Sequence, residues 1–416
     1  MKKFNVPVIY RSPLITAIKT KRKINDKLKK DFTPSFLDFG NVQVFLARHF
    51  GFCYGVENAI EISFRTIEEN PGKKIYLLSE MIHNPHVNDD LQSRGVQFLM
   101  DTKGNTLIPF ANLSADDIVI IPAFGTTMEI EEKLKSVGVE IEKYNTTCPF
   151  VEKVWNRAQA ISKNHYTIVV HGKPHHEETR ATFSHSAVHS PTIVVKNMDE
   201  TIELAKYITG ENDISNFFTQ FEGQFSKGFD PQKDLERIGV VNQTTMLASD
   251  TQGIADYLKN VMLEKYQLTD ITISERFADT RDTLCYATNE NQSSVYTLLN
   301  TAADFAIVIG GYNSSNTSHL VELCEQKLPT YFIHSEEEII SQKEIHHFNM
   351  HSREMETTYS FLPNSKPIKI LVTSGASCPD ALVESVIDRI VSFYPSAKNK
   401  EEVLAAFQSG ESILMS

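Results

Sequence analysis

The sequence predicts an α/β protein built from several lobes, each with a parallel sheet. The chain has 416 residues, of which 41% are hydrophobic and 23% charged, so it is long enough for two or three domains. A unit made of a β-rich run, a short polar loop and an amphipathic helix recurs along the chain. Strands that alternate with helices of this length are typical of parallel sheets with crossover helices.

Six such units can be delimited, at 73–95, 116–138, 166–183, 238–261, 305–326 and 368–391. They are too many for one compact core, so we expect several similar α/β lobes. Ligands of parallel α/β sheets gather at the carboxyl ends of the strands, where the polar loops of these units lie. The loops are therefore the candidate binding segments.

The charge distribution is uneven. Residues 1–30 contain ten Lys and Arg and one acidic residue, although the whole chain has a formal charge of −12. This overall charge argues against non-specific nucleic-acid binding and implies that an anionic substrate is held by local charges and dipoles. The basic stretch is rich in lysine and poor in Ser and Arg, which favours a solvated helix or arm over a transit peptide. A docking arm for an acidic electron carrier is a second interpretation of it.

No apolar run approaches the roughly 18 residues needed to span a bilayer. We therefore expect a cytoplasmic protein, or a plastid one if residues 1–30 act as a transit peptide. Two segments, 211–234 and 334–360, are interpreted as insertions outside the core. Three histidines of the second, His346, His347 and His351, are expected to be exposed rather than metal-bound. A terminal helix is predicted from about Lys398.

The five cysteines form no disulfide-framework spacing, so metal or catalytic use in a reducing compartment is the better interpretation. Cys53, Cys148 and Cys285 each close an extended run and open a helix-like one. They lie too far apart for a zinc knuckle, but three thiolates suit a metal centre with one position left open. Cys378 occupies a similar corner and is a candidate fourth ligand, whereas Cys324 on a helix face is expected in the core.

Three strand-to-helix loops have the composition of an anion cup. Gly310 and Gly311 precede Asn-Ser-Ser-Asn, and the segments Ser-Gly-Ala-Ser (374–377) and Asn-Gln-Thr-Thr (242–245) repeat the design. Backbone N–H groups at the following helix starts point toward an anion. Each loop alone indicates no more than a helix cap, but three together indicate a phosphate or diphosphate cup. Neither a Walker A motif nor Gly-x-Gly-x-x-Gly is present, so a nucleotide is not indicated.

The densest group of titratable residues follows the β-run at 167–170. It comprises His171, His175, His176, Glu177 and Glu178, and the segment Ile-His-Asn-Pro-His adds His83 and His86. A carboxylic acid beside imidazoles at a strand end is what general acid catalysis requires. A solvated surface turn is the alternative for this segment taken alone.

In combination, these motifs resemble the family of 4-hydroxy-3-methylbut-2-enyl diphosphate reductase, also called LytB. The resemblance runs from about residue 42 to about 390 and leaves both insertions unmatched. It is carried by GFCYGVENAI, IHNPHV, TTCPFVEKV, HEET, NQTT, CYAT, NSSN and SGAS. It implies three α/β lobes in a pseudo-threefold arrangement around a central iron–sulfur cluster whose apical iron has no protein ligand.

The implied lobes divide the chain at the motifs. Lobe 1 is 55–148, lobe 2 is 149–281 with the insertion 211–234, and lobe 3 is 41–54 plus 282–390 with the insertion 334–360. Residues 1–40 form a basic extension and 391–416 a C-terminal tail.

The resemblance also implies a role for each matching residue. Cys53, Cys148 and Cys285 match the ligands of a 4Fe–4S cluster, Glu178 the proton-relaying glutamate, and Thr244 the threonine that orients the substrate hydroxyl. Substrate contacts match His83, His176, Ser314, Ser315, Asn316 and Ser377. The implied activity is reductive dehydroxylation of the diphosphate to isopentenyl and dimethylallyl diphosphate in the methylerythritol phosphate route. The open iron receives the substrate hydroxyl, and a ferredoxin- or flavodoxin-like protein donates electrons.

Two departures from the family pattern are visible. Phe124 stands where many bacterial members have a histidine, and Thr126, Thr127 or Lys173 is expected to substitute for it. This Phe form resembles the plant and cyanobacterial branch of the family. Cys378 stands where Ala or Thr is usual and is expected to pack beside the site.

Two other functions fit the same residues. One is an iron–sulfur hydro-lyase, which also uses three cysteines and an open iron. The other is a non-catalytic metal-binding module that uses four cysteines, including Cys378.

Overall fold

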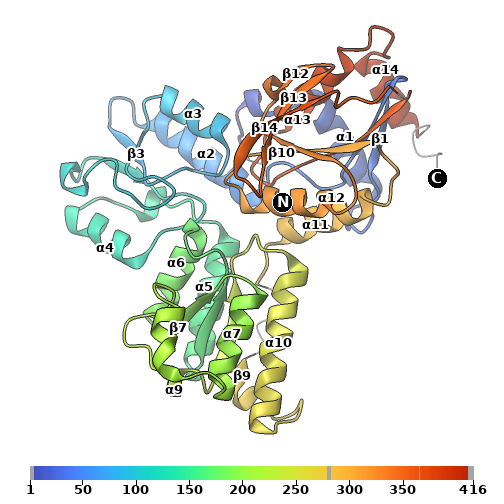
Figure 1. Ribbon diagram of the computed structural model, residues 1–416. Coiled ribbons are helices and arrows are strands. Elements are labelled where there is room, and N and C mark those ends of the chain that lie inside the picture. Colours follow the sequence, from blue (N-terminus) through green and yellow to red (C-terminus); the bar gives the residue numbers. More distant parts are fainter. Residues whose placement is uncertain (1–3, 279–282, 365, 411–416) are drawn as a thin grey trace. The chain divides into compact units, whose positions relative to one another are not determined.

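The computed structural model describes all residues except 1–3, 279–282, 365 and 411–416 (Figure 1). It consists of two compact units, which are described separately. Unit 1 comprises Met1–Glu57, His83–Asn88 and Tyr286–Ser416, and unit 2 comprises Asn58–Ile82 and Asp89–Cys285. No helix in the described part of the chain is long and apolar enough to cross a membrane.

Unit 1 is built on a five-stranded sheet with the order β1-β2-β15-β10-β11. Only β1 and β2 pair in antiparallel fashion, and the other three pairs are parallel. The strands are β1 (Ser35–Asp38), β2 (Val42–Leu46), β10 (Phe305–Ile309), β11 (Thr330–Ile333) and β15 (Ile368–Ser374). The accompanying helices are α1 (Pro13–Asn25), α11 (Tyr286–Leu298), α12 (Ser315–Glu325), α13 (Asp380–Val391) and α14 (Lys400–Ser409). The helix α14 confirms the predicted terminal helix.

Unit 2 contains two further sheets, and every strand pair in them is parallel. The first has the order β4-β3-β5, with β3 (Ile75–Leu77), β4 (Gln97–Phe98) and β5 (Ile118–Ile120). The second has the order β7-β6-β8-β9, with β6 (Thr167–His171), β7 (Thr192–Val195), β8 (Ile238–Asn242) and β9 (Phe277–Ala278).

The longer helices of unit 2 follow its strands. They are α4 (Met128–Val137), α5 (Pro149–Ser162), α6 (Glu177–Ala187), α7 (Met198–Thr209) and α10 (Ala248–Tyr266), and α5, α6 and α7 contact the four-stranded sheet (Figure 1). Two helices, α2 (Tyr54–Glu69) and α3 (Pro85–Ser93), run across the boundary between the units. Strands buried along their whole length, such as Thr167–His171 and Phe305–Ile309, explain why the sequence reads as continuous apolar runs there. The predicted α/β class with parallel-rich sheets is confirmed.

Segment 211–234 is expected from its sequence to lie outside the core, but several of its aromatic residues belong to the core of unit 2. Phe217, Phe221 and Phe229 are at most 5% exposed and pack with the residues around β6–β8. Regular structure in the segment consists of the 3-10 helix η4 (Ile214–Asn216) and the short helices α8 (Phe217–Gln220) and α9 (Pro231–Asp234). The interpretation of this segment as lying outside the core is therefore wrong for these side chains.

Segment 334–360 forms a regular antiparallel sheet of its own. Its strands are β12 (Ile339–Ser341), β13 (Glu344–Asn349) and β14 (Glu354–Tyr359). Phe348 of β13 stacks on Tyr312, with ring centroids 4.5 Å apart. This sheet therefore packs on the loop that follows β10.

The basic N-terminal region is likewise more than a solvated arm. Ser12 caps α1 by accepting a hydrogen bond from the Ile15 N–H at 2.8 Å. The side chains of Leu14, Ile15 and Ile18 are buried, while most of the lysines lie on the other faces. The predicted helix is confirmed, but one face of it is part of the core of unit 1.

Candidate functional site

The three predicted cluster cysteines occupy equivalent positions in the chain. Each directly precedes a helix, which is α2 for Cys53, α5 for Cys148 and α11 for Cys285. The N-terminus of a helix favours negative charge, because its first N–H groups have no partner within the helix. These positions therefore suit thiolates, or an anionic cluster that thiolates bind.

A shared backbone hydrogen bond fixes each of these corners. Each cysteine N–H donates to the carbonyl of a residue just beyond the end of a parallel strand. The three bonds are Cys53 to Ala376 after β15 (3.1 Å), Cys148 to Ala123 after β5 (2.9 Å) and Cys285 to Thr244 after β8 (3.1 Å). The same local arrangement thus occurs three times, once beside each parallel sheet, and in every case the thiol is placed at the carboxyl end of strands.

The structure divides the predicted site residues between the two units. Unit 1 holds Cys53, His83, Ser314, Ser315, Asn316 and Ser377, and unit 2 holds Cys148, His176, Glu178, Thr244 and Cys285. Within neither unit does the described part of the chain bring three His, Cys, Asp or Glu side chains into a metal-binding group.

In unit 2, Cys148, Cys285 and Glu178 lie close enough to influence one another. Burial, with smaller contributions from the negative charges of Cys285 and Glu178, raises the pKa of the Cys148 thiol to about 12. The described cysteines form no disulfide. A buried thiol of this kind is protonated unless a bound cation supplies compensating charge. The donor set therefore fits a metal cluster, which would provide that charge.

Glu178 and His176 are fixed by the start of α6. The Glu178 N–H donates to Nδ1 of His176 at 3.2 Å, and Oε1 of Glu178 accepts from the Thr244 N–H at 2.5 Å. Glu178 is 2% exposed and Thr244 4%. Because Nδ1 of His176 accepts a hydrogen bond, the proton of the neutral ring lies on Nε2. The imidazole is thus prepared to donate from Nε2.

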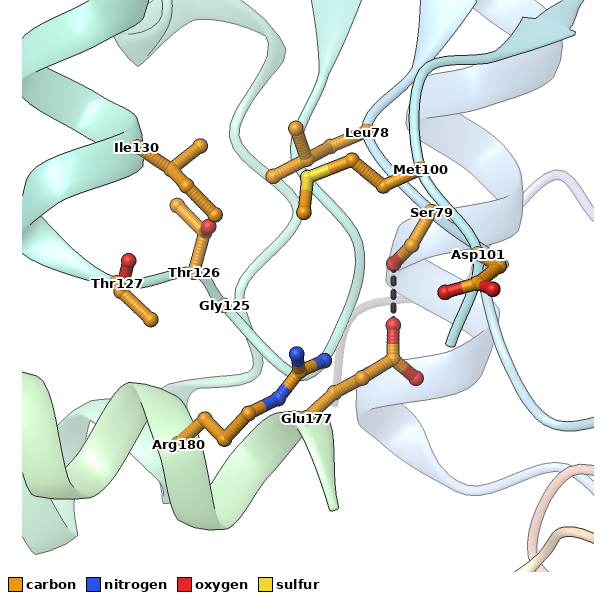
Figure 2. Close-up of a pocket in the computed structure, with 10 residues that line it drawn as sticks. All are labelled: Leu78, Ser79, Met100, Asp101, Gly125, Thr126, Thr127, Ile130, Glu177 and Arg180. Carbon is orange, nitrogen blue, oxygen red and sulfur yellow. Dashed lines mark hydrogen bonds between the residues drawn. The ribbon is translucent and has the colours of Figure 1, made fainter. Parts of the chain in front are cut away.

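A second carboxyl group, Glu177, was not assigned a role from the sequence. Figure 2 shows that it points toward Ser79, whose hydroxyl donates to Oε1 of Glu177. One turn further along α6, Arg180 donates to the carbonyls of Lys103 (2.8 Å) and Thr102 (2.9 Å). These bonds tie the first turns of α6 to the loops after β3 and β4.

The pocket around these side chains has a volume of about 40 Å³ and is lined by the ten residues of Figure 2. This volume is too small for a diphosphate ester, so we do not assign substrate binding to this pocket.

In unit 1, the loops after β10 and β15 are joined through one alanine. Asn316 Oδ1 accepts from the Ala376 N–H at 2.9 Å, and the Ala376 carbonyl accepts from the Cys53 N–H. Ser377 Oγ donates to the His83 carbonyl at 3.1 Å. Asn316 is thus bonded through Ala376 to the Cys53 corner and lies with Ser314 and Ser315 at the start of α12, while Ser377 and His83 are bonded to each other.

The loop after β10 approaches the His83 segment too closely for a side chain. A Cβ atom on Gly311 would lie 2.3 Å from the His83 carbonyl oxygen. Ser314 caps α12 and accepts from the Thr317 hydroxyl at 2.9 Å. Ser314, Ser315 and Asn316 are all at most 4% exposed, so an anion at this helix start would be largely shielded from water.

Comparison with known proteins identifies the family. The family model described as LytB protein matches residues 44–391. The chain belongs to the LytB protein family. The predicted resemblance is confirmed over the range in which the motifs occur.

Several relatives found by sequence are cyanobacterial and are named 4-hydroxy-3-methylbut-2-enyl diphosphate reductase. One from Picosynechococcus sp. is 40% identical over 352 residues, which is 84% of each chain. Another from Microcystis aeruginosa is 38% identical over 388 residues, covering 93% of this chain and 90% of the relative. Their source agrees with the predicted resemblance to the cyanobacterial branch of the LytB family.

Two solved structures of diphosphate reductases match most of this chain and support its assignment to the LytB fold. A reductase described as the terminal enzyme of the non-mevalonate pathway matches 84% of this chain and 99% of its own, with a TM-score of 0.50 and 25% identity. The corresponding enzyme of Plasmodium falciparum matches 88% of this chain and 98% of its own, with a TM-score of 0.60. At 20% identity the second match bears on the fold alone.

Phe124, which is predicted to stand where many LytB members have a histidine, lies beside His176. Its ring meets the His176 ring edge-on, with centroids 5.8 Å apart. Of the residues expected to substitute for the missing histidine, Thr126 is buried and its carbonyl is 3.1 Å from Nε2 of His185. The backbone N–H of Lys173 donates to Gln243. The substitution itself stays a prediction.

The other two cysteines are core residues. Cys378 is fully buried, its Sγ lies 3.6 Å from the Pro379 carbonyl oxygen, and burial raises the pKa of its thiol to about 12. Cys324 on α12 is also fully buried, as predicted. Cys378 thus packs beside the Ser377 loop.

The histidines of 334–360 each have a partner of their own. Nε2 of His346 is 3.2 Å from Glu344, that of His347 is 2.8 Å from Thr358, and that of His351 is 3.2 Å from Glu325. His351 is exposed, and the other two are only partly buried. The expected exposure therefore holds for His351 and not for the other two.

Proposed function

We propose that this protein reduces 4-hydroxy-3-methylbut-2-enyl diphosphate to isopentenyl and dimethylallyl diphosphate. Membership of the LytB family supports this activity, and relatives that share about two fifths of its residues are named for it. The reaction consumes two electrons and two protons, and it releases the hydroxyl oxygen as water. The protein therefore has to bind a diphosphate, deliver protons and accept electrons from a donor.

We infer that Cys53, Cys148 and Cys285 are the protein ligands of a 4Fe–4S cluster with one iron left open. Three cysteines at helix starts, held by the same backbone bond, support this assignment. Such a cluster would relay the two electrons from the donor protein and would offer a Lewis-acidic iron. Because the three ligands are thiolates, each cysteine has to lose its proton when the cluster is inserted.

The diphosphate is assigned to the loops of unit 1. Ser314, Ser315, Asn316 and Ser377 present hydroxyl and amide groups, and the start of α12 contributes N–H groups that favour an anion. We assign His83 to the same task, because its segment is bonded to Ser377. Burial of these groups excludes water, which strengthens each hydrogen bond to the phosphate oxygens.

Proton delivery is assigned to Glu178. Its carboxyl group is buried, is held by the Thr244 N–H, and lies within electrostatic reach of Cys148. His176 donates from Nε2 to the substrate, and Thr244 orients the departing hydroxyl. Protonation at one end or the other of the allylic carbon skeleton then yields the two products. The placement of Glu178 among two of the three cysteines is the observation that carries this proposal.

Electrons are proposed to come from a ferredoxin- or flavodoxin-like protein. An iron–sulfur hydro-lyase would need no reductant, so conversion of substrate without an electron donor would favour that rival. A zinc-binding module would bind metal through Cys378 as well.

The test is anaerobic reconstitution followed by iron and sulfide analysis, an absorption spectrum and turnover with a reduced donor. We expect about four iron and four sulfide per chain and product only with the reductant. Cys148→Ala should lose the cluster, whereas the matched variant Cys378→Ala should retain it. Zinc in place of iron, or loss of metal in Cys378→Ala, would overturn the assignment.

A further inference from the structure

The N-terminal region packs against the loop that carries Cys53. We define residues 4–32 as the N-terminal strap. The ring of Phe4 lies 4.9 Å from that of Tyr54, and the ring of Tyr10 lies 5.9 Å from that of Phe52. Phe4 and Tyr10 are themselves buried, at 8% and 5% exposure. Both neighbours of Cys53 in the sequence are thus in contact with the strap.

Lys19 makes the polar part of this contact. Its Nζ donates to the Phe50 carbonyl at 2.9 Å and to Asp380 Oδ1 at 2.7 Å. The same ammonium group lies 4.3 Å from the centre of the Phe50 ring. Asp380 is the first residue of α13, so Lys19 connects the Cys53 loop to a helix of the core. The two charged side chains are only 31% and 20% exposed, which limits screening by solvent.

Gly51 shows how tight this contact is. A Cβ atom there would lie 2.5 Å from Asp380 Oδ1 and 2.9 Å from Nζ of Lys19. Its φ of +77° lies in the left-handed region, which side chains disfavour. The loop before Cys53 therefore reaches the Lys19–Asp380 pair only because position 51 has no side chain.

The strap also reaches the start of α11. Nζ of Lys29 lies 3.0 and 2.9 Å from the two carboxylate oxygens of Glu290 and 5.3 Å from the centre of the Tyr286 ring. The Tyr54 N–H in turn donates to the Tyr286 hydroxyl at 3.2 Å. The residues that follow Cys53 and Cys285 in the sequence are thus bonded to each other, and the strap contacts both.

We propose that the N-terminal strap is a positioning element for Cys53 and that Lys19 is the residue through which it acts. Metal ligands on loops hold their geometry only when neighbouring groups fix the backbone that carries them. Here the strap supplies the ammonium group, and the buried face of α1 anchors it. This inference rests on the proposed assignment of Cys53 to the cluster.

The first test uses the cluster-free protein and needs no activity. Alkylation by iodoacetamide is followed by mass spectrometry of the peptides that contain Cys53 and Cys148, with Cys148 as the internal reference. In Lys19→Met, loss of a hydrogen bond from a charged group should speed alkylation of Cys53 by about tenfold or more and leave Cys148 unchanged. Lys23→Met, an exposed lysine on the same helix, is the matched control and should behave as the wild type.

Further variants separate positioning from general unfolding. Lys19→Arg keeps the charge and should restore most of the protection, and Asp380→Asn, which breaks the pair from its other end, should speed alkylation of Cys53 as well. Circular dichroism shows whether each variant is folded. If Lys19→Met is unfolded, the Cys53 alkylation rate of Asp380→Asn is used in its place. Equal Cys53 rates in the wild type and in a folded Lys19 or Asp380 variant would overturn the proposal.

The second test uses the reconstituted protein. Lys19→Met should lose iron to a chelator at least several times faster than Lys23→Met and shift the midpoint potential of the cluster, while Lys19→Arg stays close to the wild type. An unchanged rate and potential would overturn the proposal. Failure of the wild type to bind any cluster would instead refute the proposed function, and the alkylation result would still report on the anchoring of the loop.

Discussion

Replacement of Glu178 by glutamine removes a carboxyl group that can release and take up a proton, while keeping the shape of the side chain. Oε1 of Glu178 accepts a hydrogen bond from the Thr244 N–H at 2.5 Å, and the amide oxygen of glutamine can accept the same bond. The His176 contact involves the backbone N–H of residue 178 and does not depend on its side chain. The variant therefore isolates proton delivery from the local fold.

Glu178→Gln should affect kcat far more than it affects the free energy of unfolding. General acid catalysis by a positioned group contributes about 10²–10⁴-fold, so kcat should fall by this factor, which corresponds to roughly 2.7–5.5 kcal/mol of activation free energy. Stability should change much less. A hydrogen bond to a charged acceptor is replaced by one to a neutral acceptor, which costs about 1 kcal/mol.

The assay is anaerobic turnover with a reduced donor, normalised to iron content, together with a thermal unfolding curve. Glu177→Gln is the matched control, because the neighbouring carboxyl group is bonded to Ser79 and has no assigned role in proton transfer. Its kcat should stay within a few-fold of the wild type. A Glu178→Gln enzyme with a full cluster and near wild-type turnover would refute the assignment of proton delivery to Glu178.

Three further predictions concern stability. Gly51→Ala should lower the unfolding free energy by about 1–2 kcal/mol because of the positive φ alone, and by more because of the close contacts of the added Cβ. Gly72 has a similar φ but open space around it, so thermal denaturation should show a larger loss of stability for Gly51→Ala than for Gly72→Ala. Burial, reinforced by nearby positive charges, lowers the pKa of His49 from 6.5 to about 3. The unfolded chain therefore takes up this proton first, and stability falls as the pH drops from about 6.5. His49→Gln should remove that part of the slope in a comparison of unfolding curves across this range. Phe217→Ala should cost about 3–5 kcal/mol in chemical denaturation, whereas Phe218→Ala, at a residue that is 46% exposed, should cost far less; equal losses would contradict the core assignment.

Much of the fold was predictable because its signals are local. An apolar run such as 305–309 is buried along its length in a parallel sheet, and the polar loop and amphipathic stretch after it can be read directly from the sequence. The helix starts after Cys53, Cys148 and Cys285 follow from the same local pattern. Assignment of individual residues such as Glu178 depended on the family resemblance, because a strand-end carboxyl group alone has no unique function.

The parts that could not be predicted depend on tertiary contacts. Phe217, Phe221 and Phe229 lie in a stretch with little regular structure, so no periodicity marks them as core residues. The strands of 334–360 are rich in charged residues, and their pairing becomes evident only from the structure. In the N-terminal strap the lysines obscure the short apolar stripe of α1, and the contact of Lys19 with the Phe50 carbonyl joins segments whose proximity no spacing encodes.

The backbone partners of the three cysteines set the order in which a newly made chain can complete its ligand set. Ala123 and Thr244 precede Cys148 and Cys285 in the sequence, so their carbonyls have already left the ribosome when each cysteine emerges. Cys53 is the exception, since its partner Ala376 and the strand β15 that pairs with β2 are synthesised close to the end of the chain. The first cysteine to be translated is consequently the last to be held in place. On the proposed assignment of all three cysteines to one cluster, loading of the cluster would follow translation of nearly the whole chain, and an iron–sulfur delivery system would meet a finished polypeptide rather than a nascent one.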